Sequence, residues 1–177
     1  MSQKIKPTAR EIVLRENDFI VSKTDTKGKL TYCNPIFSEV SGYSELELLG
    51  KPHNIVRHPD MPRSVFKLLW ETVTAGEEFF GYVKNICKDG SYYWVFATVT
   101  PSYSVNNDTK QPQLIGFFSV RRKPDKSKVE FIQDLYRDML AAENKAERKD
   151  GVSAGIAVLN SLIQPTGKDY CEYILTL

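Results

Sequence analysis

The sequence predicts an α+β fold in which short helices pack on one face of a five-stranded antiparallel sheet. Three observations favour this fold. Five segments are rich in β-branched and aromatic residues, tight turns join neighbouring segments, and signals for short helices separate the second segment from the third. A small ligand would lie in a cavity between the helices and the sheet. The expected strands are residues 19–24, 30–33, 79–87, 92–101 and 113–122.

Turn residues define the connections between these strands. Residues 25–29, Asp-Thr-Lys-Gly-Lys, and residues 88–91, Lys-Asp-Gly-Ser, are typical of hairpin turns, because glycine readily adopts the positive φ that such turns require. The polar residues 106–108 are expected to form the loop before the last strand. The N-terminal segment, residues 1–18, is polar, and a helical turn is expected at residues 9–14.

Two short helices are expected between the second and third strands. Asn34 can cap the first helix, Pro35 suits its first position, and Gly42 ends it. Ser44 and Glu47 have the spacing of a capping box, in which each side chain accepts a hydrogen bond from the other residue's backbone N–H. These signals predict two helices of one or two turns each.

A longer helix is expected to begin at Pro62 and to end before Gly76. Apolar residues recur at helical spacing between these two positions, which indicates that one face of the helix is buried. The residues of this face are Val65, Phe66, Leu69, Trp70 and Val73.

The C-terminal residues 123–177 predict a helical extension. A helix is expected from about residue 126 to residue 143, with a narrow apolar face that a small sheet domain does not obviously cover. Residues 143–150 are charged on all sides, residues 153–163 predict a second helix, and residues 170–177 predict a short strand or an extended arm. We therefore expect the extension to self-associate or to bind a partner rather than to fold back on the sheet.

Composition excludes several classes of protein. A chain of 177 residues can form one domain with an appendage, and its net charge of +2, without a dense basic stripe, argues against nucleic-acid binding. No apolar run approaches the roughly 18 residues that a membrane helix needs, and the N-terminus has no apolar signal region. The three cysteines are odd in number and widely spaced, as expected for reduced thiols in a cytoplasmic protein.

The most distinctive segment is residues 52–62, which holds both histidines and three of the nine prolines. The prolines restrict the backbone, so at most one short helical turn, about residues 53–56, is expected. Arg57, His58 and Asp60 then offer hydrogen-bond donors, a switchable group and an acceptor. This cluster suits a polar, partly anionic ligand beside an apolar cavity. The alternative is a structural loop whose polar groups satisfy one another.

The two histidines also allow a metal or haem site. His53 and His58 are separated by proline-stiffened chain, so they do not lie on one helix face, and Asp60 is the only further ligand close in sequence. Haem ligation by one of these histidines is a further alternative. No nucleophile lies at a recognisable spacing from a base, so the sequence does not predict an enzyme.

Six short motifs form a recognisable set: Tyr32-x-Asn34, Val40-Ser41-Gly42-Tyr43, Leu49-Gly50-x-Pro52-His53-Asn54, Val56-Arg57-His58-Pro59-Asp60-Met61-Pro62, Val83-Lys84-Asn85 and Gly90-x-x-Tyr93-Trp94-Val95. Together they resemble the PAS sensor domain of bacterial aerotaxis receptors, and the run from Val56 to Pro62 is the most specific match. The resemblance divides the chain into an N-terminal cap segment (1–18), a PAS sensor domain (19–122) and the C-terminal helical extension (123–177).

This resemblance implies a redox sensor that binds FAD without covalent attachment and signals to a membrane chemotaxis protein. One departure from the family is Phe79, which stands where the family usually has tryptophan; phenylalanine can still pack on a flavin ring, with less contact area. The residues that the resemblance assigns to the cofactor site are Asn34, His53, Arg57, His58, Asp60, Phe66, Trp70, Phe79, Asn85 and Ile86.

The resemblance further implies a stand-alone energy-taxis subunit in the cytoplasm, without direct membrane insertion. A photoreceptor with a reactive cysteine is disfavoured, because neither Cys33 nor Cys87 lies in the Asn-Cys-Arg setting of such proteins. Two alternatives remain: a haem-binding PAS gas sensor, and a PAS interaction module without a cofactor.

Overall fold

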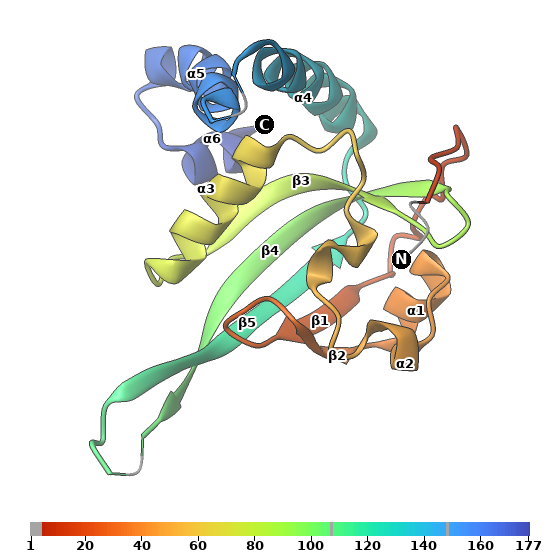
Figure 1. The fold of residues 1–177 in the computed structure, drawn as a ribbon, viewed down its shortest axis with the longest axis vertical. Helices are drawn as coiled ribbons and strands as arrows, with labels where there is room; N and C mark the ends of the chain where they lie inside the picture. Colours follow the sequence, from red (N-terminus) through yellow and green to blue (C-terminus); the bar gives the residue numbers. More distant parts are fainter. Residues whose placement is uncertain (1–4, 107, 148) are drawn as a thin grey trace.

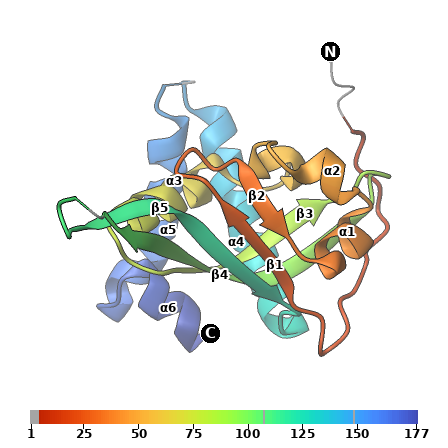
Figure 2. The ribbon, with the colours of Figure 1, turned by 90° about the horizontal axis from the view of Figure 1, so that it is seen from below.

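Five strands form one antiparallel sheet in the order β2-β1-β5-β4-β3, which confirms the predicted fold class (Figures 1 and 2). The structure is a computed structural model that describes residues 5–106, 108–147 and 149–177. Residues 1–4 of the expected cap segment, Asn107 of the expected loop and Arg148 of the charged segment lie outside this description. The strands are β1 (Ile20–Thr24), β2 (Leu30–Cys33), β3 (Phe79–Ile86), β4 (Tyr92–Val105) and β5 (Pro112–Arg122).

The two short helices that follow β2 begin where their caps predict. The Asn34 side chain accepts a hydrogen bond from the Phe37 backbone N–H, and Ser44 and Glu47 form the reciprocal bonds of a capping box. Residues 53–56 form a single 3₁₀ turn, as the surrounding prolines predict. These elements are α1 (Pro35–Ser41), α2 (Glu45–Leu48), η1 (His53–Val56) and α3 (Arg63–Thr74).

The N-terminal segment corrects the first of our expectations. Residues 9–14 form no helical turn but run extended beside β4, where the Ile12 N–H donates to the Tyr92 carbonyl at 2.7 Å. Glu11 forms a parallel bridge with Tyr92, and Leu14 is buried. The segment is extended because the start of β4 satisfies its backbone groups, which sequence propensity alone does not reveal.

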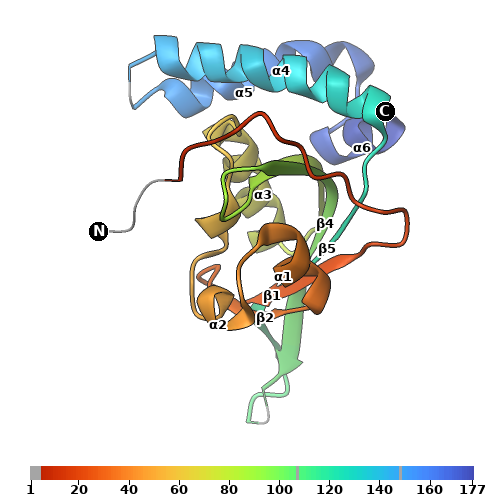
Figure 3. The same ribbon diagram turned by 90° about the vertical axis from the view of Figure 1, so that its right-hand side faces the viewer.

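The C-terminal extension is helical to its end, which corrects the expected strand or arm at residues 170–177. Helices α4 (Lys126–Lys145), α5 (Gly151–Ile163) and α6 (Tyr170–Thr176) follow the sheet, with a 3₁₀ turn η2 (Gln164–Thr166) between the last two. Asp169 caps α6 through a capping box with Glu172, a local signal that favours helix over strand. Helices α4 and α5 lie side by side at one end of the molecule, away from α1 and α2 (Figure 3).

The apolar face of α4 is not open. Helices α3 and α5 pack against α4, and the Tyr136 hydroxyl donates to the Tyr82 carbonyl of β3 at 2.8 Å. The extension therefore folds back on the domain, and the exposed face from which we expected self-association does not exist. The buried residues of this face are Val129, Ile132, Leu135, Tyr136 and Met139. Among the described residues, no helix combines the length and apolar character that crossing a bilayer requires.

Candidate ligand-binding cavity

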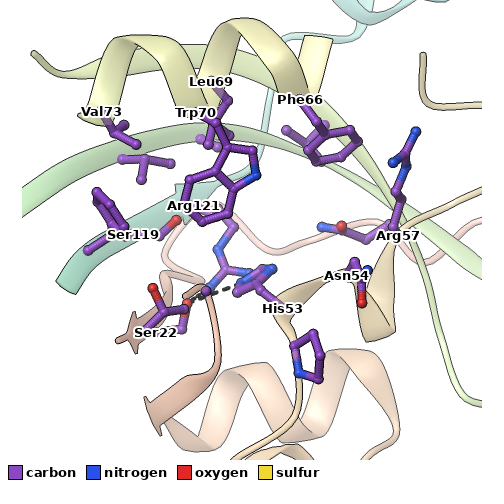
Figure 4. Close-up of a pocket in the computed structure, with 18 of the residues that line it drawn as sticks. Ser22, His53, Asn54, Arg57, Phe66, Leu69, Trp70, Val73, Ser119 and Arg121 are labelled. Atoms are coloured by element: carbon purple, nitrogen blue, oxygen red, sulfur yellow. Dashed lines mark hydrogen bonds between the residues drawn. The ribbon is translucent and has the colours of Figure 1, made fainter. Parts of the chain in front are cut away.

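A cavity of about 390 Å³ lies between α3, the sheet and the loop that contains η1 (Figure 4). Its volume falls within the roughly 300–1,000 Å³ of typical ligand sites. The lining residues are Ser22, Thr24, Lys27, Gly28, Pro52, His53, Asn54, Arg57, Phe66, Leu69, Trp70, Val73, Val83, Asn85, Ala97, Val99, Phe117, Ser119 and Arg121.

Helix α3 supplies an apolar wall. Phe66, Leu69, Trp70 and Val73 recur at helical spacing and face the cavity together (Figure 4). The Trp70 ring packs edge-on against Phe117 of β5, with ring centroids 5.4 Å apart. These residues form a surface suited to an aromatic or other flat apolar ligand.

The turn between β1 and β2 approaches this wall closely. Gly28 has a φ of 74°, and a Cβ at this position would lie 2.9 Å from the Trp70 ring. Position 28 therefore requires glycine for two reasons: the positive φ of its backbone, and the short distance to the indole ring, which leaves no room for a Cβ.

The opposite wall holds a buried positive charge that sequence analysis did not identify. Arg121 is 2% exposed and lines the cavity from β5, with its guanidinium over the Phe37 ring. Its Nη2 donates to Ser22 Oγ, whereas Nε and Nη1 have no partner among the described residues. No acidic side chain of the described chain pairs with it. Burial lowers the pKa of Arg121 to about 10, so the group remains charged at neutral pH.

His53 lies beside this charge. Its Nε2 is 3.3 Å from Ser22 Oγ, and the ring packs near Phe37. Burial, followed by the nearby Arg121 charge, lowers the pKa of His53 to about 3. The imidazole is therefore neutral. Because Ser22 Oγ accepts from Arg121, its own proton is free to be donated to His53 Nε2.

Arg57 connects the loop to the cavity rim. Its guanidinium lies 4.3 Å from the centroid of the Phe66 ring, and its Nη2 donates to the Met61 carbonyl at 2.9 Å. Arg57 also forms an antiparallel bridge with Asn85 of β3, whose side-chain Nδ2 is buried without a partner among the described residues. Arg57 and Asn85 thus bring polar groups to one end of the cavity.

His58 and Asp60 belong to the loop but not to the cavity lining. His58 is buried, and its Nδ1 accepts a hydrogen bond from the Asp60 N–H at 3.1 Å. The Asp60 carboxylate is 2.6 Å from Lys84 Nζ, which lies over the Tyr92 ring. These contacts tie the loop to β3 and β4, while His58 Nε2 is buried without a hydrogen-bond partner among the described residues.

Three other predicted site residues also lie outside the lining. The Asn34 side chain bonds within the fold: Oδ1 accepts from the Val21 N–H at 3.0 Å and Nδ2 donates to the Phe19 carbonyl at 2.7 Å. The expected position of Phe79 is corrected, because its ring is buried and stacks on Tyr170 of α6, with centroids 5.4 Å apart. Ile86 is buried at the end of β3.

The structure therefore brings together five of the ten expected residues: His53, Arg57, Phe66, Trp70 and Asn85. It adds Arg121 and Ser22, which sequence analysis missed. One signal could have identified Arg121, because Phe117, Ser119 and Arg121 alternate along one strand and such residues face the same side. Across the described residues, no group of three or more His, Cys, Asp and Glu side chains could hold a metal ion.

Comparison with known proteins gives one family and several relatives. Residues 30–117 match the model of the PAS fold. The chain is 33% identical over 152 residues to the aerotaxis receptor of Escherichia coli K12, covering 86% of this chain and 29% of the receptor. It is 31% identical over 81 residues to the nitrogen fixation regulatory protein of Klebsiella pneumoniae, covering 46% of this chain and 16% of that protein.

Solved structures share the fold. The dark structure of the blue-light photoreceptor Aureochrome1 LOV superposes with a TM-score of 0.53 at 15% identity, covering 66% of this chain and 81% of that one. A light-oxygen-voltage domain described in work with a flavin analogue gives a TM-score of 0.54 at 17% identity, covering 66% and 83%. At these identities the likeness concerns the fold alone.

Proposed function

The chain belongs to the PAS family through residues 30–117, and we propose that it is a redox sensor that binds FAD non-covalently in the cavity beneath α3. The similarity to the aerotaxis receptor over 86% of the chain supports a sensor of this kind. Because the chain spans only 29% of that receptor, the signalling output is also part of the proposal.

The observation that carries the proposal is the buried guanidinium of Arg121, whose Nε and Nη1 have no partner among the described residues and which faces a cavity with an apolar α3 wall. A buried charge without a partner costs free energy, and a ligand that accepts hydrogen bonds from Nε and Nη1 would offset that cost. The Asn85 Nδ2 group has the same need. A flavin ring system fits this donor set, because it combines a flat apolar part with carbonyl and ring-nitrogen acceptors.

Each part of the cavity then has a role. Phe66 and Trp70 would pack on the flat ring system, and Arg121 and Asn85 would donate hydrogen bonds to its acceptors. Exposed Lys27 and half-buried Arg57 line the cavity as well and provide positive charge for the phosphates of a dinucleotide.

Bound FAD supplies reversible electron transfer, and its charge and hydrogen-bonding pattern differ between its redox states. The fixed positive charge of Arg121 favours the more negative state. Asn85 can donate or accept, so its amide can follow a change at the ligand. A change of redox state can shift the conformation of the protein only as far as its two conformations differ in affinity for the two redox states.

We also propose that the output partner is a membrane chemotaxis signalling protein and that the sensor acts in the cytoplasm. The similarity to the aerotaxis receptor supports this partner class. Copurification of the chain with chemotaxis receptors from detergent-solubilised membranes, in amounts that depend on FAD occupancy, is the expected result.

The absorption spectrum of freshly purified protein tests the cofactor. A yellow protein that releases FAD on heating, identified by chromatography against FMN, is the expected result. A colourless protein that cannot be reconstituted with FAD would refute the proposal and favour the interaction module. A red protein with a Soret band would favour haem, with His53 as the histidine that lines the cavity.

A further inference from the structure

Helix α3, which forms the apolar wall of the cavity, lacks a cap of its own. Its N-cap residue is Pro62, whose side chain makes no capping hydrogen bond. The first N–H groups of a helix need acceptors, and a buried helix end without them is costly. The acceptors come instead from Glu143, which lies 80 residues later in the chain, on α4.

Glu143 satisfies these groups with both carboxylate oxygens. Oε2 accepts from the Arg63 backbone N–H and from Arg63 Nε, both at 3.1 Å. Oε1 accepts from the Ser64 backbone N–H at 2.8 Å and from Ser64 Oγ at 2.7 Å. Glu143 is 3% exposed, a burial that the charged sequence of residues 143–150 does not indicate.

Helix α5 closes this contact. A Cβ on Gly155 would lie 2.6 Å from Ser64 Oγ and 2.9 Å from Glu143 Oε1. A Cβ on Gly151 would likewise collide with Arg63 and with the Glu143 backbone. The two glycines allow α5 to lie directly against the carboxylate and exclude water from it. We call Glu143, Arg63, Ser64, Gly151 and Gly155 the α3–α4 clasp.

The clasp is adjacent to the cavity. Phe66, which lines the cavity, follows Ser64 by two residues, and the guanidinium of Arg57 packs on the Phe66 ring. Burial lowers the pKa of Arg57, and the Glu143 carboxylate opposes this effect, so the carboxylate acts electrostatically at the cavity rim. A displacement of the cavity wall therefore moves the Arg63 and Ser64 groups that donate hydrogen bonds to Glu143.

We propose that Glu143 is a positioning residue through which changes in the cavity reach the C-terminal helices α4 and α5. The FAD-dependent part of this inference rests on the proposed function. The clasp joins the cavity wall to α4 by charge-assisted hydrogen bonds, and such bonds are short, directional and sensitive to small shifts. The described hydrogen bonds to the buried carboxylate all come from Arg63 and Ser64 at the start of α3. A change in the tilt or position of α3 therefore alters all of these bonds and so acts on α4.

Amide hydrogen exchange across residues 126–163 tests this proposal under two different perturbations of the cavity. One is FAD addition, with binding followed by flavin absorbance in the same sample. The other is Leu69→Ala, which alters the cavity wall and needs no cofactor. We expect each perturbation to change exchange in α4 and α5 at least threefold in the otherwise unaltered protein, and neither to do so in Glu143→Gln.

Controls separate transmission from simple loss of structure. Glu130→Gln changes an exposed residue of the same helix and should preserve the response. Ser64→Ala removes one hydrogen bond but keeps the carboxylate and the backbone donors, so it should fold and show a reduced response.

Failure of this inference is distinguishable from failure of the proposed function. If FAD does not bind, the proposed function is refuted, and the Leu69→Ala arm still decides the role of Glu143. If neither perturbation reaches residues 126–163 in the unaltered protein, or if the response persists undiminished in Glu143→Gln, the proposed transmission is wrong.

Discussion

At the scale of single residues, Arg121 carries the most information about function. Arg121 is 2% exposed, and its Nε and Nη1 have no partner among the described residues. Such a buried charge destabilises the fold unless something in the cavity accepts hydrogen bonds from it. Ser22 and neutral His53 form a hydrogen-bonded group beside it but bring no negative charge. We therefore expect that replacing Arg121 by an apolar residue stabilises the ligand-free protein and weakens ligand binding.

The variant Arg121→Met tests this opposition. Without FAD, its free energy of unfolding should rise by about 1–3 kcal/mol, because a buried unpaired charge is replaced by an apolar side chain. Its affinity for FAD should fall by roughly tenfold to a hundredfold, since hydrogen bonds from a charged group contribute about 1.5–3 kcal/mol. Denaturant unfolding and FAD titration measure the two effects. Arg122→Met, at an exposed neighbour, is the control; lower stability with unchanged affinity would show that Arg121 is structural.

At the scale of elements, the clasp explains how a helix that begins at proline is capped. Burial raises the pKa of Glu143, but the hydrogen bonds from Ser64 and Arg63 outweigh it, so the pKa lies below the ordinary value of 4.5. The folded state thus binds the proton more weakly than the unfolded state. The stability that Glu143 contributes is fully present above pH 4.5 and is lost as the pH falls through the lower folded-state pKa.

The pH dependence of the stability of Glu143→Gln tests whether this stabilisation is lost at low pH. At neutral pH the variant should unfold more easily than the unaltered protein by about 1.5–3 kcal/mol, because Gln cannot accept from both pairs of donors. The difference should shrink below pH 4.5, as Glu143 itself becomes protonated. Unfolding curves between pH 3 and pH 7 measure it. A difference that stays constant over this range, or one equal to that of Glu130→Gln, would contradict the assignment.

Close packing of α5 gives a second prediction at this scale. Gly155→Ala favours helix by up to about 1 kcal/mol in intrinsic propensity, yet it should destabilise the protein by about 1–3 kcal/mol. The reason is the 2.6 Å approach of the new Cβ to Ser64 Oγ. Thermal unfolding measures the change, and Ser153→Ala, on the exposed side of α5, should have little effect. A more stable Gly155→Ala protein would show that α5 can shift freely.

At the scale of the whole molecule, the C-terminal helices belong to the structure of the sensor. Tyr136 bonds to the β3 backbone and packs near Trp94, and Tyr170 stacks on Phe79. Glu143 caps the helix that forms the cavity wall. The boundary expected between residues 122 and 123 therefore separates two parts that share buried contacts.

Truncation after Lys123 tests this dependence. We expect the shortened protein to lose thermal stability and to retain less FAD, because it exposes the partners of Tyr136 and Tyr170 and leaves α3 uncapped. Calorimetry and the ratio of flavin to protein absorbance measure both effects. A truncated protein that unfolds at the same temperature and stays equally yellow would show that residues 124–177 are accessory to the cavity.

Sequence alone determined the features that depend on neighbouring residues. The strands end at turns containing Gly28 and Gly90, and α1 and α2 begin at their caps, because these signals act within a few residues. The short 3₁₀ turn at residues 53–56 likewise follows from the surrounding prolines.

Tertiary structure alone decided which polar groups are buried and what they meet. Two N–H-bearing nitrogens of Arg121 have no partner among the described residues because β5 places the side chain under α3. Phe79 lies outside the cavity lining because its ring stacks on Tyr170 of α6. Glu143 caps a helix that begins 80 residues earlier. Burial and long-range hydrogen bonding depend on segments far apart in the chain, so no local pattern encodes them. The identity of the cavity-lining residues therefore emerged only once the sheet and its helices were assembled.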